Sequence, residues 1–458
     1  MAHTRRDFLI GSTAATFAPS AIAARHNQAD LIAAPADVQL VSGDHGHTKL
    51  WTYNGLAPGP MIRAKRGDRI SQRLVNNLPQ ETTIHWHGIR IDNAMDGVPG
   101  ISQQPVQPGD DFLYDFAAND AGTYWYHPHV RSWEQVARGL HGPLIIEEDI
   151  PPEVDREETL VLDDWRLDAE AQIDESFGLM HDWSHAGRIG NFVTVNGDPA
   201  HKLSVGRHER IRLRLINSAN ARVFTLGLKG LEGWVVALDG QPLSQPEAMD
   251  RIRLAPAQRA DLIVDVTGDA LGEAFLISFE RDGDYALTTL DVDTAVRPKR
   301  LAPPAPLQAN DVPALGTVAD AATATLVMAG GAMGGMRSAM IGGVETDIRE
   351  LVRKGRAWAF NGVAEPPADP LLSVRLGETA RISLKNDTRW PHAMHLHGHH
   401  FHRMGPDGEV GPLRDTLLLD PGASADISFV ADNPGAWLFH CHMLEHSAAG
   451  MSTWIDVA

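Results

Sequence analysis

A threefold internal repeat constrains the fold of this chain more strongly than any other feature of its sequence. Each copy begins with an Asn-Gly pair, continues through an isolated glycine into an alternating apolar segment, and closes that segment with an asparagine. The pairs are Asn54-Gly55, Asn196-Gly197 and Asn361-Gly362, and the closing asparagines are Asn76, Asn217 and Asn386. Because the period is as long as a whole domain, the repeat predicts three similar domains in tandem and excludes a solenoid.

Short segments with period-two alternation, separated by Gly, Pro, Asn and Asp, make up most of each copy. This pattern is typical of β-sandwiches, and we predict an all-β chain of three Greek-key β-sandwich domains. Two stretches rich in proline or acidic residues, 147–158 and 296–317, predict linkers between the copies. We therefore expect domains at 24–150, 151–300 and 301–458.

Composition narrows the class of protein. Of 458 residues, 43% are hydrophobic and 22% are charged, and no apolar run is long enough to cross a bilayer. The formal net charge of -19 argues against binding to nucleic acids and to anionic membranes. We expect a globular protein without stable membrane insertion.

The N-terminal residues have the features of an export signal. Arg5-Arg6 precedes a weakly apolar run that ends in Ala21-Ile22-Ala23. A twin arginine, a mild hydrophobic core and an Ala-x-Ala site predict export by the twin-arginine (Tat) machinery, with residues 1–23 removed as a signal peptide. We expect a periplasmic protein without internal disulfides, because Cys441 is its single cysteine.

Histidine pairs occupy matching positions in the first and third copies. Each is a His-x-His pair, so both imidazoles project from the same face of a β-strand. The pairs are His85/His87 and His127/His129 in the first copy, and His395/His397 and His440/His442 in the third. The middle copy carries Leu226, Leu228, Ile277 and Phe279 at the positions that we align with them. The eight histidines are therefore expected to converge where the first and third domains meet.

Cys441 lies between two of these histidines, and strand alternation points its thiol away from their imidazoles. His392 differs in parity from the His-x-His pair that follows it, so it is expected on the face of Cys441. His446 and Met451 come soon after Cys441 in the chain. One thiolate, two imidazoles and a weak thioether are the ligands of a blue-copper electron-transfer centre.

In combination these motifs resemble the four copper signatures of the multicopper oxidases, with their laccase and cuprous-oxidase branches. The matching strings are His85-Trp86-His87-Gly88, His127-Pro128-His129, His392 to Gly398, and His440-Cys441-His442 through His446 and Met451. The resemblance covers essentially the whole mature chain. It implies three cupredoxin domains, a type 1 copper that accepts electrons, and a trinuclear cluster that reduces dioxygen to water.

The resemblance also implies how four copper ions are held. The type 1 copper takes His392, Cys441, His446 and axial Met451; the type 2 copper takes His85 and His395; one type 3 copper takes His87, His127 and His442, and the other takes His129, His397 and His440. Electrons are expected to leave the type 1 site through Cys441 into its flanking histidines. Asp96 matches an acidic residue of the family near the cluster, and we expect it to supply protons.

The physiological electron donor is left open between Cu(I), in copper tolerance, and a phenolic or other small organic reductant. A Gly-rich segment contains four methionines, Met328, Met333, Met336 and Met340. Their thioethers could bind Cu(I), or their side chains could equally form an apolar packing face. The residues before His392 are Thr388, Arg389, Trp390 and Pro391, so the acid and the methionine that some cuprous oxidases carry near this histidine are absent. Ser447 stands where some carry a second proton-relay acid, a role for which Glu445 is the nearby alternative.

Two other functional classes fit less well. A copper nitrite reductase would not need four His-x-His pairs. A related protein without turnover, used for copper binding or in cell division, would be marked by lost copper ligands, and none is lost here.

Overall fold

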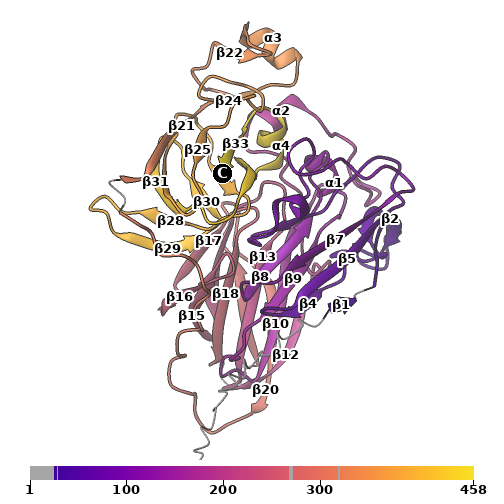
Figure 1. The fold of residues 1–458 in the computed structure, drawn as a ribbon. Coiled ribbons are helices and arrows are strands. Elements are labelled where there is room, and N and C mark those ends of the chain that lie inside the picture. The colour runs from indigo at the N-terminus through magenta and orange to yellow at the C-terminus, as the bar shows by residue number, and fades with distance from the viewer. Residues whose placement is uncertain (1–24, 28, 268–271, 318–319) are drawn as a thin grey trace, which may run out of the picture.

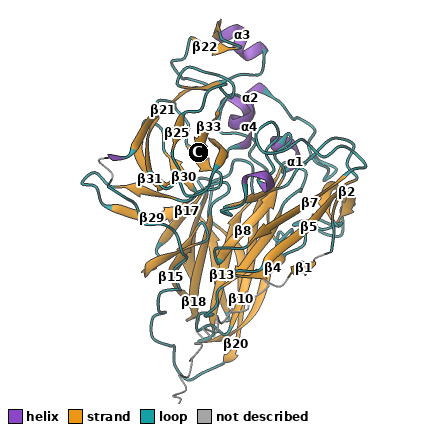
Figure 2. Cartoon of the chain, in the orientation of Figure 1, coloured by secondary structure: helices purple, strands orange, loops and turns teal. Residues whose placement is uncertain are grey.

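The structure, a computed structural model, describes residues 25–27, 29–267, 272–317 and 320–458 and consists mostly of β-strands (Figures 1 and 2). The expected signal peptide, residues 1–23, lies outside these described residues. The strands form three β-sandwich domains in chain order, which confirms the all-β prediction. The pairings between named strands stay within 25–147, 156–295 and 322–457.

The first domain has two sheets. One has the order β1-β5-β2-β3 with β7 also on β5, and comprises β1 (Arg25–Asn27), β2 (Leu31–Val38), β3 (Thr48–Tyr53), β5 (Arg69–Asn76) and β7 (Asp111–Ala117). The other has the order β4-β9-β8-β6, and comprises β4 (Ile62–Lys65), β6 (His85–His87), β8 (Gly122–His127) and β9 (Gly142–Glu147). The short helices η1 (Asn93–Met95) and α1 (Ser132–Gln135) lie in its loops.

The middle domain also has two sheets. The first has the order β11-β10-β13-β18-β15-β16, and comprises β10 (Arg156–Trp165), β11 (Phe192–Val195), β13 (Arg210–Asn217), β15 (Leu231–Leu238), β16 (Gln241–Ala248) and β18 (Arg259–Val266). The second has the order β12-β20-β19-β14-β17, and comprises β12 (Lys202–Arg207), β14 (Phe224–Lys229), β17 (Arg251–Leu254), β19 (Glu273–Ser278) and β20 (Tyr285–Ala295). The loop after β10 carries α2 (Met180–Ser184).

The third domain repeats this plan. Its first sheet has the order β24-β21-β26-β31-β28-β29, and comprises β21 (Ala322–Gly330), β24 (Trp358–Phe360), β26 (Thr379–Asn386), β28 (Phe401–Met404), β29 (Val410–Arg414) and β31 (Ser424–Val430). Its second has the order β25-β33-β32-β27-β30, and comprises β25 (Leu372–Val374), β27 (His392–Leu396), β30 (Thr416–Leu419), β32 (Gly435–Cys441) and β33 (Ser452–Val457). A hairpin of β22 (Ser338–Ile341) and β23 (Val344–Asp347), followed by α3 (Ile348–Arg353), projects at one end, and α4 (Leu444–Ala448) follows β32 (Figure 1).

The repeated asparagines make the same hydrogen bonds in all three domains. In each Asn-Gly pair both residues have positive φ, which asparagine and glycine tolerate better than other residues. The asparagine amide then bridges the neighbouring strand, as Asn54 does by donating to Asp30 O and accepting from Ile32 N. Asn196 and Asn361 form the equivalent pairs of bonds. The sequence repeat is therefore a repeat of turn chemistry.

The strand register corrects one detail of the sequence alignment. His85 pairs with His127 in the first domain and His395 pairs with His440 in the third. In the middle domain Leu226 pairs with Ser278, one residue beyond the expected Ile277. The position remains without a histidine, so the middle domain still contributes none to the cluster.

The first and third domains share one continuous apolar core. A single cluster of buried side chains contains Ile84 and Trp86 of the first domain together with Met394 and Trp437 of the third. The middle domain has a separate core, formed by residues such as Leu213 and Leu262. In Figure 1 the third domain (orange to yellow) lies beside the first (indigo to purple), and both rest on the middle domain. The strands with His-x-His pairs meet at this junction.

Candidate metal centres

Cys441, His392 and His446 form a compact buried site in the third domain. The Cys441 Sγ atom lies 3.6 Å from Nδ1 of His392 and 3.8 Å from Nδ1 of His446, and the two nitrogens lie 3.1 Å apart. These ligand atoms lie close enough together to hold one metal ion. Met451 is also buried, and its backbone carbonyl accepts a hydrogen bond from Cys441 N.

The other nitrogen of each imidazole at this site is already engaged. Thr388 Oγ1 lies 2.9 Å from Nε2 of His392, and the His185 backbone carbonyl lies 2.7 Å from Nε2 of His446. A carbonyl only accepts, so His446 carries its proton on Nε2 and keeps Nδ1 free. The Trp358 ring packs against both imidazoles, with centroid distances of 5.0 and 4.5 Å. Metal ligands are commonly oriented by such outer contacts.

Burial controls protonation at this site. It raises the pKa of Cys441 to about 12 and lowers the pKa of His446 to about 4, although the hydrogen bond to His185 opposes the second shift. Burial, followed by the neighbouring His446, also holds the pKa of His392 well below its ordinary value. The site thus offers neutral imidazoles, and a bound metal is what would favour the thiolate over the thiol.

The eight remaining motif histidines gather between the first and third domains. The antiparallel pairs β6/β8 and β27/β32 bring two histidines of each domain side by side. Across the interface, the His85 ring stacks on His397 at 3.9 Å and the His87 ring stacks on His395 at 3.7 Å. The structure thus brings together every histidine that the sequence placed in this group. In three sets of these histidines the ligand nitrogens lie within 4.8 Å of one another, close enough to hold a metal ion: His85/His395/His397, His85/His87/His127 and His129/His397/His440.

Unsatisfied nitrogens show that this cluster suits metal ions. Among the described residues, buried imidazole nitrogens without a hydrogen-bond partner include Nε2 of His85, His129 and His395 and Nδ1 of His87 and His442. Two more pairs face each other nitrogen to nitrogen, His397 with His440 at 3.2 Å and His127 with His442 at 3.3 Å. Buried polar atoms without partners are costly, and a metal ion would satisfy these lone pairs.

Burial favours the neutral imidazole at seven of the histidines in this cluster. It is the largest cause of the lowered pKa of seven of these histidines, and neighbouring imidazoles lower the pKa further in each case: His87, His127, His129, His395, His397, His440 and His442. Neutral imidazole is the form that binds metals.

Acceptors in the surrounding shell fix which nitrogen faces inward. Nδ1 donates to a backbone carbonyl or to Asp96 in five of the rings: His85 and His397 (Asp96), His127 (Pro128), His395 (Asp415) and His440 (Cys441). In these rings Nε2 is the free nitrogen. His87 is reversed, because its Nε2 lies 3.3 Å from Asp415 Oδ1 and its Nδ1 has no partner.

Asp96 lies at the end of η1, fully buried between the two domains. Its carboxylate oxygens lie 2.9 and 3.1 Å from Nδ1 of His397, and its backbone carbonyl accepts from Nδ1 of His85. The next residue, Gly97, has a φ of 81°, and a Cβ there would lie 1.9 Å from Ile84 O. Only glycine allows the chain to approach β6 this closely and bring Asp96 under the two rings.

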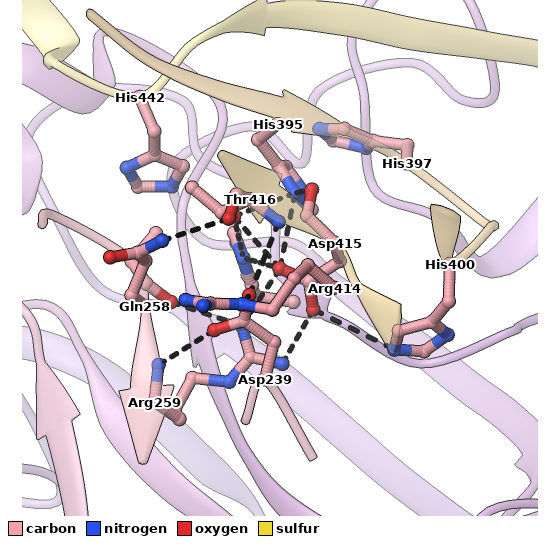
Figure 3. A network of polar contacts seen from close by, with 12 residues as sticks. Asp239, Gln258, Arg259, His395, His397, His400, Arg414, Asp415, Thr416 and His442 are labelled. Carbon is pink, nitrogen blue, oxygen red and sulfur yellow. Dashed lines mark hydrogen bonds and ion pairs between the residues drawn. The ribbon is translucent and has the colours of Figure 1, made fainter. Parts of the chain in front are cut away.

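A buried polar network beside the cluster was missed by sequence reasoning (Figure 3). Asp415 accepts hydrogen bonds from Nη1 and Nη2 of Arg259 at 2.9 and 2.5 Å, and Asp239 accepts from Arg414 Nε at 2.6 Å. Burial alone would raise the pKa of Asp415, but Arg259 and the adjacent histidines hold it well below its ordinary value. The available signal was charge alternation in the middle domain, where Arg259, Asp261 and Asp265 share one face of β18.

Other residues considered from the sequence lie in different settings. Met328 is buried in the core, whereas Met333 is 75% exposed in a loop. The spacing of the last three methionines is not helical, because residues 331–337 form a loop and Met340 lies in β22. The Glu445 carboxylate points to the middle domain, where Oε1 accepts from Asn220 Nδ2 at 2.8 Å.

Comparisons with known proteins agree with this geometry. Family models described as multicopper oxidase match residues 37–150, 156–293 and 343–458. The chain is 31% identical to the multicopper oxidase MmcO of Mycobacterium tuberculosis, over 88% of this chain and 82% of that protein. It is 29% identical to copper resistance protein A of Pseudomonas syringae pv. tomato, over 87% of this chain and 88% of that protein.

Solved structures have the same fold. A multi-copper oxidase from Pseudomonas thermotolerans superposes with a TM-score of 0.82 at 34% identity, covering 95% of this chain and all of that one. Lac15, from a marine microbial metagenome, superposes with a TM-score of 0.76 at 40% identity, covering 93% and 99% of the two chains.

Proposed function

The chain belongs to the multicopper oxidase family, and from this premise we propose that its donor is Cu(I) and that the residues below hold its copper ions. It is an oxidoreductase with cupredoxin domains that couples one-electron oxidation of a donor to reduction of dioxygen to water. The family implies one type 1, one type 2 and two type 3 copper ions. A related protein without turnover is not favoured, because every ligand position of the motifs carries a ligand residue.

His392, Cys441, His446 and axial Met451 would hold the type 1 copper. The trinuclear cluster would be held by His85 and His395 (type 2), by His87, His127 and His442, and by His129, His397 and His440 (type 3). Bound copper supplies one-electron transfer at the first site and dioxygen reduction at the second. The unpartnered inward nitrogens and the Cys441 thiol support these assignments.

The protein's own residues connect and protonate the two sites. Cys441 belongs to the type 1 site, and the residues on either side of it, His440 and His442, belong to the cluster, so the backbone joins the sites covalently. Asp96 would hold the proton on Nδ1 of His397 and deliver protons to the cluster, because its carboxylate is within hydrogen-bond distance of that nitrogen.

One observation carries the choice of Cu(I) as donor. A surface cavity of about 420 Å³ is lined by the side chains of Met333, Asp387, Arg389 and the buried Thr388, and the Thr388 hydroxyl contacts His392. Its lining within the described residues has no aromatic side chain. Pockets for organic ligands are mostly apolar and aromatic, whereas thioether and carboxylate are metal ligands.

The opposite edge of the type 1 site also disfavours a bulky organic donor. His446 is fully buried and its Nε2 donates to His185, the residue that follows α2. Trp390 closes the space beside this segment, with its ring 5.2 Å from that of His185 and its Nε1 bonded to Ala332 O. A similar protein, copper resistance protein A, bears a name consistent with a role in copper tolerance.

Oxygen uptake with two donors tests the proposal. With Cu(I), Met333→Leu and Asp387→Asn are expected to raise KM, while oxidation of a substituted phenol and the blue absorption of the type 1 site stay unchanged. Met61→Leu, at an exposed methionine of the first domain, is the matched control. Cys441→Ser should abolish uptake with both donors. If Met333→Leu lowered the rate of oxygen uptake equally with Cu(I) and with the phenol, or lowered it with neither donor, this donor site would be ruled out.

We also propose that residues 1–23 are a Tat signal peptide and that the mature protein is periplasmic. The Arg5-Arg6 pair and the Ala-x-Ala site support this, although they lie outside the described residues. Among the described residues, no helix is both long and apolar enough to span a membrane.

We propose domain boundaries at 24–150, 151–300 and 301–458. The absence of named-strand pairing across these boundaries within the described residues supports them.

A further inference from the structure

Asp415 lies where all three domains meet, in direct contact with the cluster histidines. It stands between β29 and β30 of the third domain, beside His87 of the first domain and Arg259 of the middle domain (Figure 3 shows the network of Asp415 and Arg259). Its Oδ1 atom lies 3.3 Å from His87 Nε2 and 3.6 Å from His395 Nδ1. The side chains of Asp415, His87 and Arg259 are all 0% exposed.

Arg259 fixes the orientation of the Asp415 carboxylate. Nη1 and Nη2 donate to its two oxygens, which is the planar two-point geometry that makes such pairs directional. Arg259 is itself held, because Nε donates to Thr123 O and Nη1 also donates to Ala257 O. The carboxylate therefore cannot rotate without breaking several buried hydrogen bonds.

Thr416 adds a second constraint on the same carboxylate. Its hydroxyl donates to Asp415 Oδ1 at 2.8 Å, which leaves the hydroxyl oxygen free to accept. That oxygen lies 3.2 Å from His395 Nδ1 and 3.4 Å from His87 Nε2. The stacked rings of His87 and His395 therefore share two acceptors, the Asp415 carboxylate and the Thr416 hydroxyl oxygen.

This contact has a specific consequence for His87. A carboxylate only accepts hydrogen bonds, so His87 must carry its proton on Nε2 and present Nδ1 as the lone pair. In the cluster rings that Asp96 or a backbone carbonyl engages, the engaged nitrogen is Nδ1 and the free one is Nε2. His87 Nδ1 is buried and has no hydrogen-bond partner.

We infer that Asp415, held by Arg259, is a positioning residue that selects the tautomer in which His87 offers Nδ1 to copper. This rests on the proposed assignment of His87 as a cluster ligand. The middle domain, which has no copper ligands of its own, then contributes the cation that orients one of them. Outer partners of metal-binding histidines fix ring orientation and tautomer in this way, and their loss costs about 10- to 100-fold in metal affinity or activity.

The competing explanation is a purely structural ion pair between domains. The chain contains a matched example, because Arg253 of the middle domain donates to both carboxylate oxygens of Asp420 in the third, at 2.8 and 2.9 Å. That pair is exposed and has no contact with a cluster histidine among the described hydrogen bonds. Asp420→Asn is therefore the control for Asp415→Asn.

The test uses the copper-loaded, full-length mature protein. Asp415→Asn keeps the shape of the side chain but offers an N–H where His87 needs an acceptor. Dialysis against a graded copper chelator, with total copper and electron paramagnetic resonance measured at each step, is expected to show cluster copper released at about 10- to 100-fold lower chelator concentration. The type 1 blue absorption and its reduction by Cu(I) should match the wild type.

Two outcomes separate this inference from its alternatives. Retention of all cluster copper at wild-type chelator concentrations would overturn it, as would equal copper loss in Asp420→Asn. If Asp415→Asn does not fold, Thr416→Val provides the test, since it removes one hydrogen bond from the carboxylate without leaving an unpaired charge. Cluster copper in Thr416→Val should be released earlier than in the wild type, and an unchanged release curve would overturn the inference. If Cu(I) is not the donor, the result that shows this is slow reduction of the type 1 copper by Cu(I) in the wild type, which does not depend on the release of cluster copper.

Discussion

Oδ2 of Asp96 lies 2.9 Å from Nδ1 of His397, although 301 residues separate the two in the chain. The contact crosses from the first domain to the third, and the same residue bonds His85 through its backbone carbonyl. One buried residue therefore orients imidazoles on both sides of the cluster.

Replacing Asp96 by Asn should slow dioxygen reduction at least about 10-fold, because the amide cannot donate the proton and is a poorer acceptor for His397. Stopped-flow absorption would separate type 1 reduction by the donor, which should be unchanged, from reoxidation by dioxygen. Asp92→Asn, at the cap of the same turn, is the control. Normal reoxidation in Asp96→Asn would show that the carboxylate is dispensable.

Replacing Met451 by Leu should raise the reduction potential of the type 1 copper, because an axial donor stabilises Cu(II) more than Cu(I) and leucine provides no such donor. Met451 is fully buried, so leucine keeps the apolar packing at a cost below about 1.5 kcal/mol. Redox titration of the blue absorption measures the shift. A potential equal to that of the wild type would place Met451 outside the copper site.

Gly331→Ala should destabilise the wall of the type 1 site. Gly331 has a φ of 73°, and a Cβ there would lie 2.1 Å from Cη2 of Trp358, the ring that packs on His392 and His446. Overpacking of this kind costs about 1–3 kcal/mol. Thermal unfolding monitored by the blue absorption measures the loss. Gly335→Ala, where a Cβ meets nothing within 4 Å, should leave it unchanged.

Because of Asp261, the free energy of unfolding of the protein should decrease as the pH falls. Burial alone would raise the pKa of its carboxyl, but Arg212 and Arg214 bring it below its ordinary value. Such a group stabilises the fold above its unfolded pKa, about 4, and loses that contribution as the pH falls through the folded pKa.

Asp261→Asn is therefore expected to cost about 3–5 kcal/mol at pH 7, because it leaves buried arginine charge uncompensated, and less below about pH 4. Urea unfolding of the copper-free wild type and variant, at pH 7 and below about pH 4, measures the difference in free energy of unfolding at each pH. Asp420→Asn, which removes an exposed pair, should cost at most about 1 kcal/mol. If the difference in free energy of unfolding between wild type and Asp261→Asn were the same at every pH, the ionisation of Asp261 would not contribute to stability as predicted.

Changing Arg5 and Arg6 together to Lys should prevent export, because the Tat machinery reads the arginine pair. The precursor should then accumulate in the cytoplasm, as fractionation and immunoblotting would show. Replacing His3 by Ala provides a control outside the pair. Undiminished periplasmic protein from the Lys-Lys variant would exclude a twin-arginine signal.

Local patterns predicted much of the architecture. The Asn-Gly turns and the closing asparagines carry their hydrogen bonds within short segments, so three sandwich domains followed from the chain alone. Strand parity separated His392 from His395, and in the structure His392 does lie beside Cys441 while His395 faces the cluster. These inferences needed only the alternation of side chains along a strand.

Contacts across domain interfaces could not be predicted in the same way. Asp415 and Arg259 lie 156 residues apart, and neither occupies a repeated position, so periodicity gave no reason to join them. The pairing of Arg212 with Glu148 likewise depends on how the middle and first domains pack. The Ile277 alignment failed for a different reason, since counting from the repeated glycine misses a one-residue difference in where β19 pairs with β14.

The division of the cluster between β6 and β8 at one end of the chain and β27 and β32 at the other has a consequence for biosynthesis. A ribosome releases the first-domain histidines long before it makes their third-domain partners on β27 and β32. A chain that ends before β32 lacks some of the eight histidines that we assign to the oxygen-reducing centre. Such a chain, or one whose third domain has not yet docked on the first, does not hold the complete site at which copper would react with dioxygen.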